Sequence, residues 1–285
     1  MQGDGRIQYF YGVSAFSDRF PTAFVTGGSS GLGKVLVEGL LSEGTKVWAG
    51  SRSEKRVVET GLDVLPVALD LSDGKAMDQF FAEPPWEKTP CLLINNAGFG
   101  QFGRLSSIPE EDLSKQLHAM LESAMRLSKH FLEADGGMQP APAIVNVSSL
   151  AVEFPLPYLH GYNAVKGGLS GFSRSLAIEF PGGKGKPFVI DLRPGDYRTG
   201  FNQAVVGSAE SDKLAKVWSA LEHHLANGAD PAGIWKPVKK ALLRERSQTV
   251  RVGTVFQARV APLLARIFPE RWVAATQNRY YSIKQ

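Results

Sequence analysis

Cysteine is almost absent from this chain of 285 residues, which contains only Cys91. One cysteine cannot form an internal disulfide, and this is typical of a reducing compartment, so we expect a cytoplasmic protein. Cys91 opens an apolar run over residues 91–94. That position predicts a buried thiol with no chemical role.

Long apolar runs and metal-ligand patterns are missing as well. No stretch reaches the roughly 18 apolar residues that a membrane-spanning helix needs. Residues 1–21 have neither a basic start nor a continuous apolar core, so they do not predict a secretion signal. The five histidines show no metal-ligand spacing, and adjacent His223 and His224 would point apart on a helix. We therefore expect no metal site.

Acidic residues are scarce in the C-terminal segment. Residues 236–285 hold 11 Lys and Arg but only 2 acidic residues, a net charge of +9, so the rest of this +4 chain carries −5. This basic C-terminal segment is either a solvated surface or an element weakly attracted to an anionic membrane surface or substrate. Within it, residues 254–268 show helical apolar periodicity. No base-reading module accompanies the charge, so we expect no nucleic-acid partner.

The length suits a single α/β domain over residues 22–285, preceded by an N-terminal extension over residues 1–21. The extension contains five aromatic residues, which we expect to pack on the domain or on a neighbouring subunit. No linker or repeat divides the domain. The expected strands cover residues 23–26, 45–50, 64–69, 92–95, 143–149, 188–192 and 249–252, and the expected helices include residues 31–43, 109–132 and 161–180.

A glycine-rich turn joins the first strand to the first helix. Gly27, Gly31 and Gly33 follow it with the spacing G-x-x-x-G-x-G. Glycine lets the backbone approach a pyrophosphate closely, and the helix N-terminus supplies free N–H groups and the positive end of its dipole. Because a strand precedes the turn and a helix follows it, the pattern favours a dinucleotide site over a plain turn.

The end of the second strand indicates which dinucleotide is bound. An acidic residue there favours a free ribose 2′-OH, whereas an arginine suits a 2′-phosphate. The chain has Ser51 and Arg52 at this point, with no acidic residue before Glu54. A guanidinium can pair with phosphate through two hydrogen bonds, so we expect NADP(H) rather than NAD(H).

Tyr162 and Lys166 are four residues apart in a helical stretch, so both side chains leave one helix face. An ammonium group favours the phenolate, so Lys166 should lower the pKa of Tyr162 from its usual value of about 10. Such a tyrosine can exchange a proton with an alcohol oxygen, which Ser149 at the end of the preceding strand could hold. The same Tyr-x-x-x-Lys spacing also arises in helices by chance.

Four segments in order resemble the short-chain dehydrogenase/reductase family over about residues 22–202. They are Thr26-Gly27-Gly28-Ser29-Ser30-Gly31-Leu32-Gly33, Asn95-Asn96-Ala97-Gly98, the set Ser149, Tyr162 and Lys166, and Pro194-Gly195. The resemblance implies a single Rossmann-type doubly wound α/β domain, with a parallel sheet of about seven strands flanked by helices. It also implies a homodimer or homotetramer.

The resemblance implies an oxidoreductase that interconverts a carbonyl and an alcohol by hydride transfer. Tyr162 would be the general acid and base, Ser149 would hold the carbonyl oxygen, and Lys166 would tune Tyr162 and bind the ribose. Ser149 is preferred to Ser148 because it has the family's spacing of 13 residues to Tyr162. The implied cofactor-binding residues are Gly27, Ser29, Ser30, Gly31, Leu32, Gly33, Ser51, Arg52, Asp70, Leu71, Asn96, Ala97, Gly98, Tyr162, Lys166, Pro194, Gly195 and Thr199.

The segments around residues 95–103 and 194–201 are similar to those of family members that act on apolar ketones and aldehydes, including steroids and retinoids. A flap at about residues 196–235 would cover such a substrate, and Glu153 and Asp196 could add polar selectivity. The expected pocket residues are apolar or aromatic, although they could equally pack the core. They are Phe99, Leu150, Phe154, Tyr158 and Tyr197.

Met120 departs from the family pattern. Members usually have an asparagine there, which holds a water molecule for proton relay to the lysine, and a thioether cannot hold that water well. An alternative therefore stays open, namely a cofactor-binding protein of the same fold with weak or no redox activity and a sensor or structural role.

Overall fold

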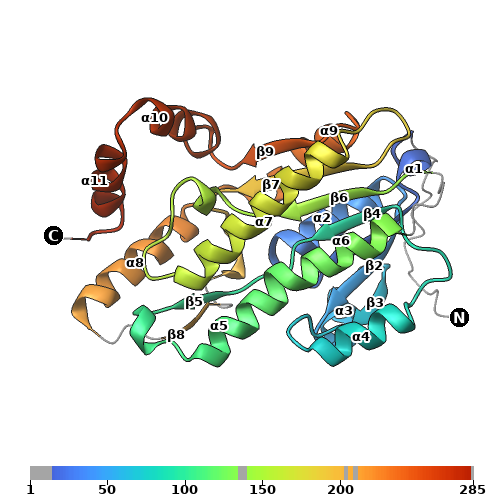
Figure 1. Ribbon diagram of the computed structural model, residues 1–285, viewed down its shortest axis with the longest axis horizontal. Coiled ribbons are helices and arrows are strands. Elements are labelled where there is room, and N and C mark those ends of the chain that lie inside the picture. Colours follow the sequence, from blue (N-terminus) through green and yellow to red (C-terminus); the bar gives the residue numbers. More distant parts are fainter. Residues whose placement is uncertain (1–14, 134–139, 202–204, 208–210, 284–285) are drawn as a thin grey trace, which may run out of the picture.

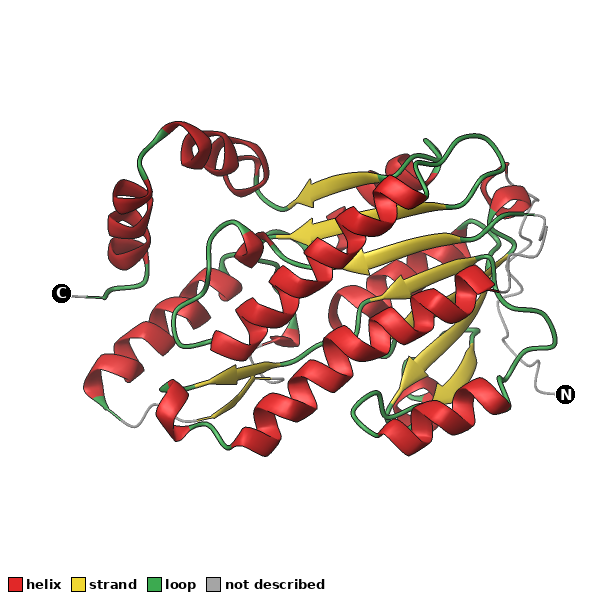
Figure 2. Ribbon diagram, in the orientation of Figure 1, coloured by secondary structure: helices red, strands yellow, loops and turns green. Residues whose placement is uncertain are grey.

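The computed structural model describes residues 15–133, 140–201, 205–207 and 211–283. Its centre is a parallel sheet of seven strands in the order β3-β2-β1-β4-β6-β7-β9 (Figures 1 and 2). This confirms the expected doubly wound architecture. The strands are β1 (Thr22–Thr26), β2 (Lys46–Ser51), β3 (Leu65–Ala68), β4 (Leu92–Asn95), β6 (Ala143–Val147), β7 (Phe188–Pro194) and β9 (Gln248–Val252).

Helices cover both faces of the sheet. On one face, α2 (Gly31–Ser42) and α9 (Trp235–Leu242) pack apolar side chains against the strands. On the other face, α4 (Gly74–Ala82), α6 (Ser123–Glu133) and α7 (His160–Glu179) do the same. The central strands are therefore buried on both sides, which is why they read as continuous apolar runs rather than as alternating patterns.

The end of the predicted N-terminal extension belongs to the core. Helix α1 (Ala15–Arg19) buries Phe16, whose ring centroid lies 5.0 Å from that of Phe20 and 5.5 Å from that of Trp235. Phe20 is fully buried as well. These two side chains therefore pack on the chain's own domain, whereas the aromatic residues 9–11 lie outside the described residues.

The long helix expected over residues 109–132 is interrupted. It begins as α5 (Glu110–Leu117), continues through a π-helical turn (His118–Glu122) and ends as α6. A π-turn inserts extra backbone into the helix and is frequent at functional sites. Here it carries Met120, which is buried.

Further elements gather at the carboxyl end of the sheet (Figure 1). β5 (Gly100–Phe102) and β8 (Val205–Gly207) form a small parallel sheet, and α8 (Asp212–Ala226) follows. Beyond β9 come a π-turn (Phe256–Val260), α10 (Ala261–Ile267) and α11 (Glu270–Tyr280). No helix within the described ranges is long and apolar enough to cross a membrane. The remaining short elements are α3 (Glu54–Val58) and the 3-10 turns Leu105–Ser107, Leu150–Val152 and Pro231–Ile234.

Candidate active site

A cavity of about 1270 Å³ opens at the carboxyl end of the sheet. This exceeds the roughly 300–1,000 Å³ of most ligand pockets, so the cavity has room for two ligands side by side. Ser149, Tyr162 and Lys166 all line it, as does every predicted cofactor residue except Gly33. Of the predicted substrate residues, it is lined by Phe99, Leu150, Phe154 and Tyr197.

Two predicted site residues lie outside the wall of this cavity. Gly33 sits inside the first turn of α2, where an added Cβ would be 2.1 Å from the carbonyl oxygen of Gly27. It is needed for the turn to close rather than for contact with a ligand. The Tyr158 ring packs against Phe102, with 5.9 Å between centroids, and against His160. Tyr158 therefore does not line the cavity, contrary to the prediction.

The glycine turn presents an open helix N-terminus to the cavity. Gly27 and Gly31 have φ values of +65° and +52°, which glycine adopts without steric cost. Ser30 is the N-cap of α2, but its side chain makes no capping hydrogen bond, so the first N–H groups of the helix stay available. An added Cβ at Gly31 would meet only Thr199, at 3.7 Å. This arrangement fits a pyrophosphate group.

Two arginines line the cavity after β2. Arg52 follows the strand and Arg56 belongs to α3. Within the described part of the chain, no hydrogen bond or ion pair engages either guanidinium. Asp70, which follows β3, accepts hydrogen bonds from the N–H and hydroxyl of Ser72 through Oδ1, at 2.9 and 2.7 Å. The two guanidinium groups are the available partners for an anionic ligand at this end.

The two serines after β6 point to different partners. Ser148 donates its hydroxyl hydrogen to the carboxylate of Asp191. Ser149 Oγ accepts the N–H of Ala151 at 3.0 Å and hydrogen-bonds the phenol of Tyr162. Successive residues of an extended chain point to opposite sides, so only the second serine faces the phenol.

Tyr162 and Lys166 lie one turn apart on α7, and both are buried. The ammonium nitrogen of Lys166 is 5.6 Å from the ring centroid of Tyr162 and donates a hydrogen bond to the carbonyl oxygen of Val147 at 2.7 Å. The ring of Phe201 packs on Tyr162 with 5.5 Å between centroids. The structure thus brings the three predicted catalytic side chains to one wall of the cavity.

Burial sets the protonation of both groups. It raises the pKa of Tyr162 to about 12, although a hydrogen bond with Ser149 lowers this pKa. Burial lowers the pKa of Lys166 to about 8, although the negative charge of Asp191 raises this pKa. The predicted net lowering of the Tyr162 pKa is therefore wrong in this structure, because desolvation of the phenolate raises the pKa and the negative charge of Asp196 raises it further.

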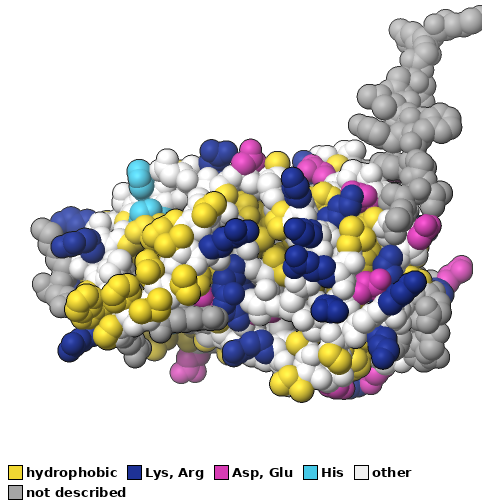
Figure 3. All heavy atoms as spheres, turned by 90° about the horizontal axis from the view of Figure 1, so that it is seen from above, with side chains coloured by type: hydrophobic (Ala, Val, Ile, Leu, Met, Phe, Trp, Pro, Cys, Tyr) yellow, Lys and Arg dark blue, Asp and Glu magenta, His cyan; other side chains and the backbone are white. Residues whose placement is uncertain are grey.

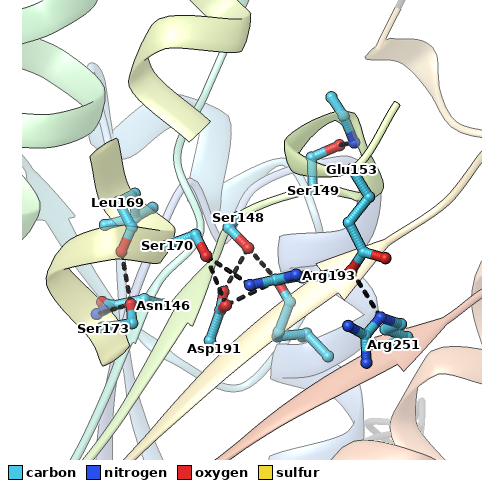
Figure 4. Close-up of polar contacts among 12 residues, drawn as sticks. Asn146, Ser148, Ser149, Glu153, Leu169, Ser170, Ser173, Asp191, Arg193 and Arg251 are labelled. Atoms are coloured by element: carbon cyan, nitrogen blue, oxygen red, sulfur yellow. Dashed lines mark hydrogen bonds and ion pairs between the residues drawn. The ribbon is translucent and has the colours of Figure 1, made fainter. Parts of the chain in front are cut away.

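A network of charged and polar side chains that the sequence did not reveal surrounds Asp191 and Arg193 (Figure 4). Asp191 in β7 accepts hydrogen bonds from Ser148, from the hydroxyl of Ser170 at 2.8 Å and from Arg193 Nε at 2.9 Å. Asp191 and Arg193 are both nearly fully buried. The sequence does contain a signal for this network, because Asp191 and Arg193 are two charged residues in an otherwise apolar strand. Charged side chains are buried in such a strand only when they have partners.

The network reaches the loop that carries Ser149. Glu153 accepts hydrogen bonds from Arg193 Nη1 and Arg251 Nε, both at 2.6 Å (Figure 4). Glu153 directly follows the 3-10 turn (Leu150–Val152) that begins after Ser149. The residue expected to add polar selectivity is therefore engaged by two arginines, and the ion pairs hold the serine loop against β7 and β9.

Met120 fills the space between the turn at Gly98 and α7. Its sulfur accepts the N–H of Phe99 at 3.4 Å. An added Cβ at Gly98 would lie 3.0 Å from Met120 Cε and 3.6 Å from Lys166 Nζ. The thioether is therefore close to the lysine but offers only a weak acceptor, and the carbonyl of Val147 is the polar partner that Lys166 uses.

The far end of the cavity is formed by elements beyond the recognised motifs. Asp196, at the start of the predicted flap, is half-buried, and desolvation raises the pKa of its carboxyl group. It accepts a hydrogen bond from Gln257 Nε2 at 2.6 Å. It also hydrogen-bonds Tyr280. Asp196 therefore ties this region to the C-terminal helices. The C-terminal residues that line the cavity include Phe256, Leu264, Phe268, Trp272 and Tyr280.

The model of the short chain dehydrogenase family matches residues 21–208. This chain belongs to that family. The family consists of oxidoreductases, and its match includes the glycine turn and all three predicted catalytic side chains.

Individual relatives extend over nearly the whole chain. A 3-ketodihydrosphingosine reductase of Bacteroides thetaiotaomicron is 27% identical over 271 residues, covering 90% of this chain and 94% of that protein. A short chain dehydrogenase/reductase from Burkholderia phymatum in complex with NAD has a TM-score of 0.74 at 20% identity, covering 90% and 95% of the two chains. One from Sphingobium yanoikuyae in complex with NADPH has a TM-score of 0.61 at 19% identity, covering 93% and 97%. These two structures share the fold of this chain.

Proposed function

We propose that this member of the family is an NADP(H)-dependent oxidoreductase that interconverts a carbonyl and an alcohol. The observation that carries the proposal is the placement of Ser149, Tyr162 and Lys166 on one cavity that the open N-terminus of α2 also lines. A proton donor and an anion-binding helix end in one cavity are what a dinucleotide-dependent carbonyl reduction requires.

The cavity wall suits NADP(H). The N-terminus of α2 would hold the pyrophosphate, Asp70 the adenine amine, and Lys166 the ribose of the nicotinamide. The bound nicotinamide supplies the hydride in reduction and accepts it in oxidation. The Burkholderia relative is described with NAD and the Sphingobium relative with NADPH, so the preference rests on this chain's own residues. Arg52 and Arg56 provide two guanidinium groups for a 2′-phosphate.

The three side chains divide the proton chemistry between them. Ser149 donates a hydrogen bond to the carbonyl oxygen and stabilises the negative charge that develops on it. Tyr162 transfers its phenolic proton to the same oxygen, and its pKa of about 12 keeps that proton in place until the charge develops. The charge of Lys166 stabilises the phenolate that is left. In alcohol oxidation the proton moves in the opposite direction.

An apolar substrate fits the remaining wall. Phe99, Leu150 and Phe154 lie near the catalytic groups, and Leu264 and Phe268 line the far end. Apolar lining with few polar groups favours a hydrophobic carbonyl or alcohol. The Bacteroides relative is named for a sphingoid ketone, which belongs to that class.

We also propose that the protein is a cytoplasmic homodimer or homotetramer. The resemblance of the four motifs supports the homo-oligomer, and the single cysteine supports the compartment.

Replacing Tyr162 by phenylalanine tests the proposed function. The measurement is carbonyl-dependent NADPH oxidation with a panel of apolar ketones and aldehydes. We expect Tyr162→Phe to lower kcat by at least about 100-fold, because a positioned proton donor contributes that much. NADPH affinity should stay close to that of wild type. Tyr158→Phe is the matched control and should keep wild-type activity, since Tyr158 lies outside the cavity wall.

Two results would overturn the proposed function. One is a Tyr162→Phe variant that keeps the wild-type rate. The other is a wild-type protein that binds NADPH but oxidises it with no carbonyl in the panel, which would instead support a cofactor-binding protein without redox activity.

A further inference from the structure

The C-terminal helices carry an apolar stripe on their outer surface. Val260, Leu263 and Ile267 follow one another at spacings of three and four residues, the repeat that places side chains on one helix face. These three residues are 40%, 59% and 68% exposed. Figure 3 shows apolar side chains gathered over the end of the molecule where these helices lie. Such outer apolar faces are uncommon on soluble proteins and mark interaction sites.

The same helices face the cavity on their other side. Phe256 and Gln257 line it from the π-turn, Ala261 and Leu264 line it from α10, and Trp272 lines it from α11. A helix that covers a cavity needs only one apolar face. This segment has two, and the three residues of the outer one are each at least 40% exposed.

Arginines accompany the apolar stripe. Arg259, Arg271 and Arg279 are exposed, and no ion pair joins them to a described side chain. Residues 254–281 contain four arginines and a single acidic residue. Exposed apolar side chains bordered by arginines are the pattern with which helices bind the surface of an anionic membrane.

We propose that the outer surface of the π-turn, α10 and α11 docks onto an anionic lipid bilayer. A second copy of the chain is the competing occupant, but a two-fold interface pairs a surface with itself. It would bring the arginines of two copies together with only one acidic residue of this segment from each copy, and like charges across an interface repel. A bilayer with anionic headgroups offers both the apolar medium and the opposite charge.

The substrate class that this docking implies rests on the proposed function and narrows it. The helices that would touch the bilayer are the ones that line the far end of the cavity. The substrate class is therefore a carbonyl or alcohol on a long hydrocarbon chain, which resides in the bilayer and enters the cavity at these helices. The cavity, at about 1270 Å³, has room for that chain beside a dinucleotide.

Co-sedimentation of the full chain with vesicles tests the docking without a catalytic readout. The probes are vesicles of phosphatidylcholine and phosphatidylserine at a ratio of about four to one, and vesicles of phosphatidylcholine alone. We expect the wild type to sediment with the mixed vesicles, to bind the neutral vesicles far less and to be released by salt. The double variant Arg259→Gln, Arg271→Gln should bind the mixed vesicles about 25-fold more weakly, since each arginine near an anionic surface contributes about fivefold.

The apolar contribution has its own variant and matched control. The double variant Leu263→Ser, Ile267→Ser should bind the mixed vesicles at least about tenfold more weakly, because both side chains lose their burial in lipid. The double variant Val58→Ser, Ile178→Ser removes apolar side chains that are 65% and 86% exposed on α3 and α7. It should bind like the wild type.

The outcomes separate the docking from the proposed function. The docking is overturned if vesicle binding is the same with and without phosphatidylserine, at low and high salt, and in the wild type and the two double variants of this surface. Stripe-dependent dimers in analytical ultracentrifugation, without vesicle binding, assign the surface to a second copy and overturn it too. The arginine double variant and the Leu263→Ser, Ile267→Ser double variant should both reduce a short, water-soluble ketone at the wild-type rate. The four substituted positions lie outside the cavity wall. If neither the wild type nor any variant reduces a ketone, while vesicle binding is as expected, the proposed function fails and the docking stands.

Discussion

Lys166 is a buried ammonium group whose pKa is the result of two opposing effects. Burial lowers it to about 8, and the carboxylate of Asp191 in β7 raises it. Asp191 does not hydrogen-bond the ammonium; it is held in place by Ser148, Ser170 and Arg193. The carboxylate therefore acts on Lys166 through its charge, at a position that the network fixes.

Asp191→Asn should move the pH dependence of carbonyl reduction. Lys166 is charged below its pKa of about 8, so kcat/KM of the wild type should fall as pH rises through about 8. Removing the negative charge lowers the pKa of Lys166, so in the variant the fall should begin at a pH lower by about one. The measurement is the pH profile of kcat/KM for a water-soluble ketone.

Glu153→Gln is the control for this variant. It removes a charge from the same network, beside Arg193 and Arg251. Both variants should lose about 3 kcal/mol of unfolding free energy, because each breaks an ion pair with the buried Arg193. Glu153 does not contribute to the pKa of Lys166, so its variant should keep the wild-type pH profile. Equal profiles for all three proteins would contradict the role of Asp191.

At the scale of elements, the proposed preference for NADP(H) depends on the connection from β2 into α3. Arg52→Ala and Arg56→Ala should each raise the Kd of NADPH by about tenfold or more, the usual effect of losing a charge-assisted hydrogen bond. The Kd of NADH should stay within about twofold, because NADH has no 2′-phosphate. Fluorescence titration with both dinucleotides measures this, and equal losses for the two would show that the arginines do not read the phosphate.

The elements predicted well are those with local signals. Strands β1, β4 and β6 are continuous apolar runs, and the turn at Gly27 and Gly31 needs backbone conformations that glycine favours. The pairing of β5 with β8 had no such signal, because two strands of three residues each meet across about a hundred residues of chain. The π-turn around Met120 also went unpredicted, since its residues have the periodicity of an ordinary helix.

At the scale of the whole molecule, the candidate site has a half that motifs reveal and a half that they do not. Ser149, Tyr162 and Lys166 could be predicted because their spacing resembles a family pattern. The side chains from α10 and α11 could not, since only tertiary packing brings them to the cavity. The pKa values of Tyr162 and Lys166 also depend on burial, which sequence spacing does not show.

A crystal structure of the protein with NADP⁺ tests the central claim most directly. We predict the pyrophosphate at the N-terminus of α2, the 2′-phosphate beside Arg52 and Arg56, and the nicotinamide next to Tyr162, Lys166 and Ser149. A dinucleotide bound elsewhere, or one whose nicotinamide lies out of reach of the Tyr162 hydroxyl, would contradict the account.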